Sequence, residues 1–176
     1  MYHQQQNQFN NNHNHIYRIN KNTNEQGKQA QQDGITPGKL APAAASEIPE
    51  VAAAARFRPW FTEMLVSYDT VHLKTDNVAY ADQYFLQMFS FPLLKGNMQT
   101  ALQEPFTAVI TESTAKKYFG NTDPIGKVVT TLDDMPVKIT GVAKDVAANS
   151  SIQFTMLISW ATLEAPANAD NFSWMN

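Results

Sequence analysis

The sequence contains no cysteine, and this absence excludes disulfide bonds, thiolate metal sites and cysteine nucleophiles together. No apolar run approaches the roughly 20 residues that a membrane-spanning helix needs, and the first residues lack the pattern of a signal peptide. Lysine and arginine number 13 against 16 acidic residues and form no basic stripe, so nucleic-acid binding is disfavoured. We therefore expect a soluble chain, which is also compatible with a piece cut from a larger protein.

The residues that are present indicate a folded protein. Hydrophobic residues make up 43% of the 176 positions and aromatic residues 11%, which suits a chain with a buried core. A chain of this length can bury one substantial core, or two small cores that are joined closely. The periodicity of apolar residues then indicates which segments build that core.

The strongest local signals lie between residues 106 and 142. Residues 107–110 form a short β-branched run of strand length, and Thr111 follows where a helix N-cap belongs. Gly120 can end this helix in a left-handed conformation. Three apolar residues fall on one helical face at i, i+3 and i+4 spacing, namely Ala115, Tyr118 and Phe119. The pattern predicts a strand followed by a helix with one buried face.

The second half of this region predicts a hairpin. Residues 127–132 form a second strand, and the turn at 133–136 leads into a third strand at 137–142. The alternation of apolar residues slips by one at Gly141, which indicates a β-bulge. The whole unit is therefore predicted as strand, helix, strand, hairpin, strand, and its chemistry is burial rather than catalysis.

The rest of the chain predicts short elements separated by polar turns. Residues 21–34 are expected to form a loop or a frayed hairpin, and residues 145–151 a polar loop. Asp82 is placed to cap a short helix. Strands are predicted at 15–20, 51–57, 64–68, 71–74, 77–80 and 152–158, and helices at 36–47 and 159–164.

Residues 1–14 are rich in glutamine and asparagine and are expected to form a poorly ordered polar arm. The histidines His3, His13 and His15 raise the alternative of a metal site. A lone His-x-His lacks the third and fourth ligands that fix a zinc ion, so the composition favours the polar arm.

Two other groups of side chains are candidates for chemistry. The stripe of Phe85, Met88 and Phe89 at helical spacing suits a ligand box, but such a stripe more often packs a core. Four acidic residues, Asp69, Asp133, Asp134 and Asp145, suit metal ligands or acids of a hydrolase, but their positions in turns favour a structural role. No P-loop, nucleophile elbow or zinc-protease motif is present. We therefore assign no catalytic, cofactor-binding or metal-binding residue.

A series of short motifs resembles one known family, the MacB-like periplasmic core domain of FtsX-like ABC transporter permeases, in its Bacteroidetes type. No single motif is decisive, but they come in the family's order across residues 9–160. The motifs are IYRIN (16–20), TPGKLAP (36–42), IPEV (48–51), RF (56–57), YAD (80–82), FSFPLLKG (89–96), ALQEP (101–105), VITES (109–113), AKKYFG (115–120), DPIGK (123–127), TGV (140–142), KDV (144–146) and NS (149–150).

The resemblance implies an α+β fold in which a porter-like α/β subdomain is interrupted by a smaller inserted α/β subdomain. Residues 15–82 and 152–176 would build the porter-like part, which would be incomplete at its C-terminus, and residues 84–146 the insertion. The family's flanking membrane helices and the porter segment expected after residue 176 are missing from this sequence. The alanine run 52–55 is also less apolar than a core strand usually is.

The resemblance also implies a function. The chain would be a non-catalytic domain on the periplasmic side of the bacterial inner membrane, and it would transmit ATP-driven motion to a substrate or partner protein in the cell envelope. Its partners would be the membrane helices of the same permease, a nucleotide-binding ATPase subunit or domain, and a periplasmic adaptor or envelope protein. No cofactor and no nucleic acid is implied. The isolated fragment is expected to be monomeric and the intact permease dimeric.

The alternative is a free-standing periplasmic module that grips a peptide or a glycan through exposed aromatic side chains. Trp60, Phe61, Phe89 and Phe91 are the candidates for such a surface. Core packing explains Phe89 and Phe91 equally well, so Trp60 and Phe61 beside Pro59 are the better surface candidates. Adjoining membrane helices in the full-length gene would separate this alternative from the permease domain.

Overall fold

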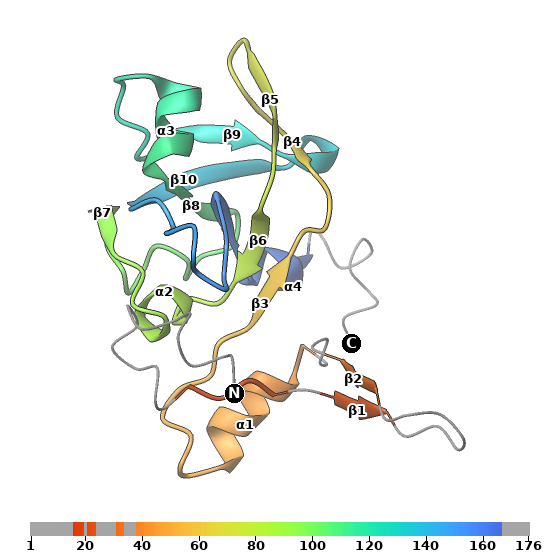
Figure 1. Ribbon diagram of the computed structural model, residues 1–176. Helices are drawn as coiled ribbons and strands as arrows, with labels where there is room; N and C mark the ends of the chain where they lie inside the picture. The colour runs from red at the N-terminus through yellow and green to blue at the C-terminus, as the bar shows by residue number, and fades with distance from the viewer. Residues whose placement is uncertain (1–15, 20, 24–30, 34–37, 167–176) are drawn as a thin grey trace.

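The computed structural model describes residues 16–19, 21–23, 31–33 and 38–166 (Figure 1). The predicted polar arm 1–14 and its histidines lie outside these residues. Within them, strands and short helices alternate, and the expected α+β class is confirmed. The helices are α1 (Leu40–Glu47), α2 (Phe85–Met88), α3 (Glu112–Phe119) and α4 (Ala161–Glu164), with one 3-10 turn, η1 (Leu132–Asp134).

Nine strands of the described chain form one mixed sheet in the order β3-β6-β11-β8-β10-β9-β4-β5, and β7 also pairs with β10. The pairs β8–β10 and β6–β11 are parallel, and the other pairs are antiparallel. The strands are β3 (Phe57–Pro59), β4 (Met64–Tyr68), β5 (Val71–Thr75), β6 (Val78–Ala81), β7 (Leu93–Gly96), β8 (Thr107–Thr111), β9 (Val128–Thr130), β10 (Pro136–Ala143) and β11 (Met156–Ser159).

A separate antiparallel pair of strands lies close to the start of the chain. It consists of β1 (Lys21–Thr23) and β2 (Gln31–Asp33), so the hairpin alternative for residues 21–34 is confirmed. This pair and α1 lie at one end of the molecule, and the hairpin of β4 and β5 projects from the opposite end (Figure 1).

The central unit folds as predicted. Strand β8 runs directly into α3, and the side chain of Thr111 caps the helix by accepting a hydrogen bond from the backbone N–H of Thr114 at 3.4 Å. Gly120 ends the helix with φ +59°, in the range that favours glycine. The predicted bulge is present in β10, because its register against β8 shifts between Ile139 and Gly141.

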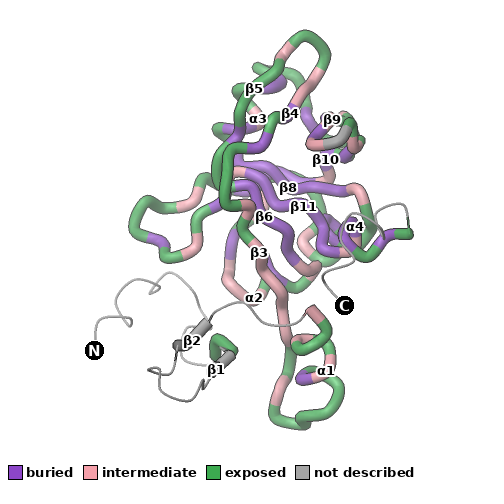
Figure 2. The backbone as a smooth tube through the Cα atoms, turned by 90° about the vertical axis from the view of Figure 1, so that its right-hand side faces the viewer, coloured by how far each residue is buried: buried purple, intermediate pink, exposed green. Residues whose placement is uncertain are grey.

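Both faces of the central strands are buried, and alternate residues of these strands supply the two cores. On β6, Val78 and Tyr80 belong to one core cluster while Ala79 and Ala81 belong to the other. Helix α3 covers the first face with Tyr118 and Phe119, and α2 covers the second face with Phe85 and Leu86. Strands β6, β8 and β11 are therefore buried at every position and have no polar face (Figure 2).

Several predicted boundaries are wrong where the segment gains little burial. Residues 16–19 form no strand, and Tyr17 is 84% exposed. The strand predicted at 51–57 begins only at Phe57, because the alanine side chains before it offer little apolar area, whereas the Phe57 ring stacks on Phe85 at 4.9 Å. The last strand begins at Met156 rather than at residue 152.

Two local predictions near the turns also need correction. The carboxylate of Asp82 does not cap α2; the N-cap of this helix is Tyr84, and no side chain binds its first N–H groups. Residues 132–134 form a 3-10 turn between β9 and β10, so the second strand ends at Thr130 and the third begins at Pro136.

The predicted division at residues 82–84 and 146–152 falls within the continuous sheet. Strand β11 pairs with β6 on one side and with β8 on the other, so strands from both parts share one set of backbone hydrogen bonds. The division into a porter-like part and an insertion stays a prediction.

Candidate functional site

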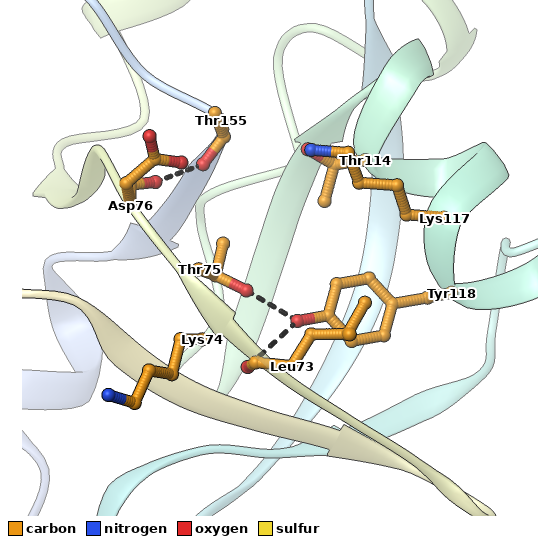
Figure 3. Close-up of a pocket in the computed structure, with 8 residues that line it drawn as sticks. All are labelled: Leu73, Lys74, Thr75, Asp76, Thr114, Lys117, Tyr118 and Thr155. Atoms are coloured by element: carbon orange, nitrogen blue, oxygen red, sulfur yellow. Dashed lines mark hydrogen bonds between the residues drawn. The ribbon is translucent and has the colours of Figure 1, made fainter.

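A small polar cleft lies between β5 and α3. The hydroxyl groups of Thr75 and Tyr118 point toward one another across it and form a hydrogen bond, and the Tyr118 hydroxyl also donates to the carbonyl oxygen of Leu73 at 3.4 Å (Figure 3). Burial raises the pKa of Tyr118, and the hydrogen bond with Thr75 opposes this change. The cleft has a volume of ≈ 30 Å³, which is room for about one water molecule. It is too small for a substrate.

A larger groove of ≈ 190 Å³ lies beside this cleft, at the start of α3. Asp145 and Ser113 both line this groove. The Asp145 carboxylate accepts a hydrogen bond from the Ser113 backbone N–H at 3.0 Å and another from the Ser113 hydroxyl at 2.5 Å. Burial would raise the pKa of Asp145, but these hydrogen bonds, one with Thr111 and the charge of Lys117 outweigh it and keep the pKa below its ordinary value. A carboxylate in this position satisfies the free N–H groups at the start of a helix.

The chemistry of this groove is that of a helix cap. Ser113 and Asp145 have no imidazole between them, because His72, the histidine of the described chain, binds the hydroxyl of Ser67 on β4 instead. In the part of the chain that the structure describes, no group of three or more histidine, aspartate or glutamate side chains is placed to hold a metal ion. The arrangement positions α3 and does not resemble a hydrolytic site.

The other acidic candidates occupy turns. Asp69 lies between β4 and β5 with φ +52°, and Asp134 lies in η1 with φ +56°. Both take the left-handed conformation that aspartate tolerates better than most residues. The predicted positions of these two residues in turns are confirmed.

The aromatic candidates do not form a binding platform. Phe91 is 5% exposed and its ring meets Phe154 edge-on at 5.0 Å. Phe89 is half-buried, with its ring centre 4.9 Å from that of Phe85, so the expected core role is confirmed for these two members of the stripe. The surface prediction for Trp60 is wrong, because Trp60 packs against the core cluster that α3 covers. Phe61 is 77% exposed and is the one member of the four that projects into solvent.

Sequence reasoning missed a cluster around Arg56, the residue before β3. Its backbone N–H and its Nε both donate to Oδ2 of Asp82, at 2.7 and 2.9 Å, and its Nη2 donates to Oδ1 at 2.9 Å. Its Nη1 donates to the carbonyl oxygen of Gly38 at 3.1 Å and to Oε1 of Glu164 at 2.6 Å. The guanidinium carbon lies 4.5 Å from the centre of the Trp160 ring.

The electrostatics of this cluster favour a permanent charge. Burial alone would lower the pKa of Arg56, but the hydrogen bonds and charges of Asp82, followed by those of Glu164, outweigh burial and raise it. The cluster joins Gly38, two residues before α1, to Asp82 directly after β6 and to Glu164 at the end of α4. The sequence carries one signal for it, since Asp82 directly follows β6, a strand without any charged residue.

Comparison with known proteins gives the same family for the whole chain. The family model described as MacB-like periplasmic core domain matches residues 1–174. A solved domain of a permease protein from Porphyromonas gingivalis is 33% identical, with a TM-score of 0.62 over 77% of this chain and 61% of that chain. The chain therefore spans about three fifths of that relative. No curated protein matches the sequence.

Two further solved structures share the fold. The periplasmic region of MacB from Actinobacillus actinomycetemcomitans is 17% identical with a TM-score of 0.56, over 70% of this chain and 54% of that chain. The extracellular domain of the ABC-type transporter YknZ from Gram-positive bacteria is 18% identical with a TM-score of 0.50, over 64% of this chain and 57% of that chain. Among the described residues, no helix has both the length and the apolar character that crossing a membrane requires.

Proposed function

The chain belongs to the family of MacB-like periplasmic core domains, and from this premise we propose that it is the non-catalytic extracytoplasmic domain of an ABC transporter permease subunit. In this proposal the domain transmits ATP-driven motion to a substrate or partner protein in the cell envelope. The observation that carries the proposal is the family match over residues 1–174. The similarity to a permease domain that is 33% identical supports it.

The partners follow from this role. The domain is connected to membrane helices of the same permease, on the periplasmic side of the inner membrane, and a nucleotide-binding ATPase subunit or domain supplies the energy. The moving domain acts on a periplasmic adaptor or envelope protein. The intact permease is a dimer, and the isolated chain is a monomer because the membrane part supplies most of the dimer contact.

The fold suits the transmission of motion. The central strands of the sheet, whose two faces are both covered by packed side chains, behave as one rigid body, since close-packed interiors have low compressibility. A push delivered at one end of such a body reaches the opposite end, where the β4–β5 hairpin projects (Figure 1). The polar groove at α3 and the small cleft at Tyr118 have no role in this mechanism beyond holding the helix.

The proposal is tested in the full-length permease in lipid nanodiscs, with a single spin label on each subunit. Val128 on β9 is 50% exposed and this chain has no cysteine, so Val128→Cys supplies one label per domain once any cysteines elsewhere in the permease are replaced. We expect the distance between the two labels to differ between the nucleotide-free and the ATP-bound permease. An unchanged distance distribution, in a permease that still hydrolyses ATP, would contradict the proposal.

Nucleotide binding by the isolated chain is the second test. The ATPase lies elsewhere in this proposal, so Mg-ATP should leave the melting temperature of the chain unchanged. An increase in melting temperature with nucleotide concentration would assign nucleotide binding to this domain and would argue against a purely mechanical role.

A further inference from the structure

The Arg56 cluster holds residues 38–50 to the sheet through two sides of unequal strength. We propose that Arg56 is a two-sided clamp: the Asp82 side stays closed and holds β3 to β6, while the Glu164 side opens and releases residues 38–50. The biological meaning of this clamp rests on the proposed function, because residues 38–50 lie at the end of the molecule opposite the β4–β5 hairpin (Figure 1). The clamp itself is a property of this chain.

The Asp82 side has the geometry of a strong interaction. Arg56 uses Nε and Nη2 in a paired contact with both carboxylate oxygens, and its backbone N–H adds a third hydrogen bond. The two side chains are 15% and 16% exposed, so water competes weakly for them. Breaking such a pair leaves a charge in a poorly solvated place, which is strongly unfavourable.

The Glu164 side is more accessible to water. The Glu164 side chain is 54% exposed, and its Oε1 meets Nη1 of Arg56 without a second carboxylate contact. Exposed ion pairs contribute little and are screened by salt. The same Oε1 also accepts a hydrogen bond from Nε1 of Trp160 at 3.0 Å. Glu164 therefore keeps a partner when it separates from Arg56, which lowers the cost of opening.

Within the described part of the chain, the segment that the clamp holds has little other attachment. Helix α1 has one buried residue, Ala44, while Leu40 is 37% exposed and Ile48 is 46% exposed. Among the described residues, the bond from Arg56 Nη1 to the carbonyl of Gly38 is the hydrogen bond that joins residues 38–50 to the chain beyond Val51. Nη1 donates both to the Gly38 carbonyl and to Glu164. When Glu164 separates, water takes its place beside Nη1 and competes with the Gly38 carbonyl for this donor, so the second contact of this side weakens with the first.

The test is hydrogen–deuterium exchange on the isolated chain with the variants Glu164→Gln and Asp82→Asn. Glu63→Gln is the matched control, because Glu63 has a similar exposed side chain, 58%, in an ion pair with Lys74. We expect Glu164→Gln to raise exchange in residues 39–50 about 5-fold and to leave β6 and β8 unchanged, since a hydrogen bond to a charged group is replaced by a neutral one. Asp82→Asn should raise exchange in residues 39–50 and in β3 and β6, and should lower the melting temperature.

Salt supplies a readout that a purely structural role of Glu164 would not give. In the wild-type chain, about 1 M NaCl should raise exchange in residues 39–50, because the exposed side of the clamp is screened. In Glu164→Gln the same salt should have little effect there. Exchange in β8 should not respond to salt in either protein.

Three results would overturn the clamp. The first is that exchange of residues 39–50 is the same in Glu164→Gln as in Glu63→Gln. The second is that Glu164→Gln raises exchange equally in residues 39–50 and in β8. The third is that salt changes exchange of residues 39–50 identically in the wild type and in Glu164→Gln. If Asp82→Asn does not fold, Glu164→Gln and the salt series still decide the question. If the exchange data contradict the clamp but the label distance in the permease depends on nucleotide, the proposed function stands without the clamp. If the exchange data support the clamp but the label distance does not change, the clamp stands without the proposed function.

Discussion

Residues 38–56 and residues 57–164 follow one another in sequence but are held in place by different forces. The first region contains α1, in which Ala44 is the one buried residue, and it is tied to the sheet through the guanidinium group of Arg56. The second region contains three strands that are buried at every position and two covered sheet faces (Figure 2). Apolar burial stabilises the sheet region, and polar contacts position the N-terminal region.

In the proposed function, the two regions would perform two different tasks. A body that moves as a unit needs the dense packing of the sheet region, in which each lost methylene group is costly. A connection that adjusts while the body stays folded needs contacts that water can replace, such as those of Glu164. Substitutions in the two regions should therefore differ by several kcal/mol in their effect on the free energy of unfolding.

The largest expected effect belongs to the core under α3. Phe119 is 6% exposed, and its ring centre lies 4.5 Å from that of Tyr68. Phe119→Ala should therefore lower the free energy of unfolding by ~3–5 kcal/mol. Its counterpart in the N-terminal region is Leu40→Ala, which should cost less than ~1 kcal/mol. Urea denaturation of both variants checks the pair. A cost below ~1 kcal/mol for Phe119→Ala would mean that the ring is not part of the core.

A smaller effect is expected for the hydroxyl group of Tyr118. Tyr118→Phe leaves the buried Thr75 hydroxyl without its partner, and we expect a loss of about 1–2 kcal/mol. Tyr84→Phe is the control, because Tyr84 is 50% exposed and should change the stability by less than ~0.5 kcal/mol. Equal effects of the two substitutions in thermal denaturation would show that burial around Tyr118 has no consequence.

A pH-dependent effect is expected for Asp145. Its pKa is lowered in the folded chain from the ordinary 3.8, so its contribution to stability is fully present above that value and is lost as the pH falls through the folded pKa. Asp145→Asn should cost about 1 kcal/mol or less near pH 7, since the carboxylate is largely exposed, and the difference from wild type should shrink below about pH 4.

The measurement is urea denaturation of both proteins over a series of pH values, with Asp76→Asn as an exposed control. If the deficit of Asp145→Asn were the same at about pH 3 as at about pH 7, the cap of α3 would not depend on the charge of Asp145.

The smallest effect is expected for an exposed ion pair of the sheet region. Nζ of Lys74 lies 3.6 Å from Oε2 of Glu63, and the two side chains are 75% and 58% exposed. Lys74→Gln should therefore change the free energy of unfolding by less than ~0.5 kcal/mol. Differential scanning calorimetry at low and high salt checks this value. A large effect would mean that exposed charges stabilise the sheet as well, and the contrast between the two regions would lose its basis.

The fold was predictable from the sequence where local and tertiary signals agree. Thr111, the apolar face of α3 and Gly120 each act within one or two helical turns, and the strand before them is continuously apolar. The predictions failed where the outcome depends on a distant partner. Asp82 has the right position for a helix cap, but it pairs with Arg56, which lies 26 residues earlier in the chain. Trp60 follows a proline and precedes the exposed Phe61, yet it packs against side chains of the sheet.

The sequence by itself determined the fold class, the central strand–helix–hairpin unit and the resemblance to a family, because these depend on local periodicity and on the order of short motifs. Only the tertiary structure decided that both sheet faces are covered and that Arg56 joins the two regions. The reason is physical: a strand's hydrogen-bond partners, and the partner of a buried charge, are set by which distant segments pack beside it. Neither spacing nor propensity along the chain carries that information.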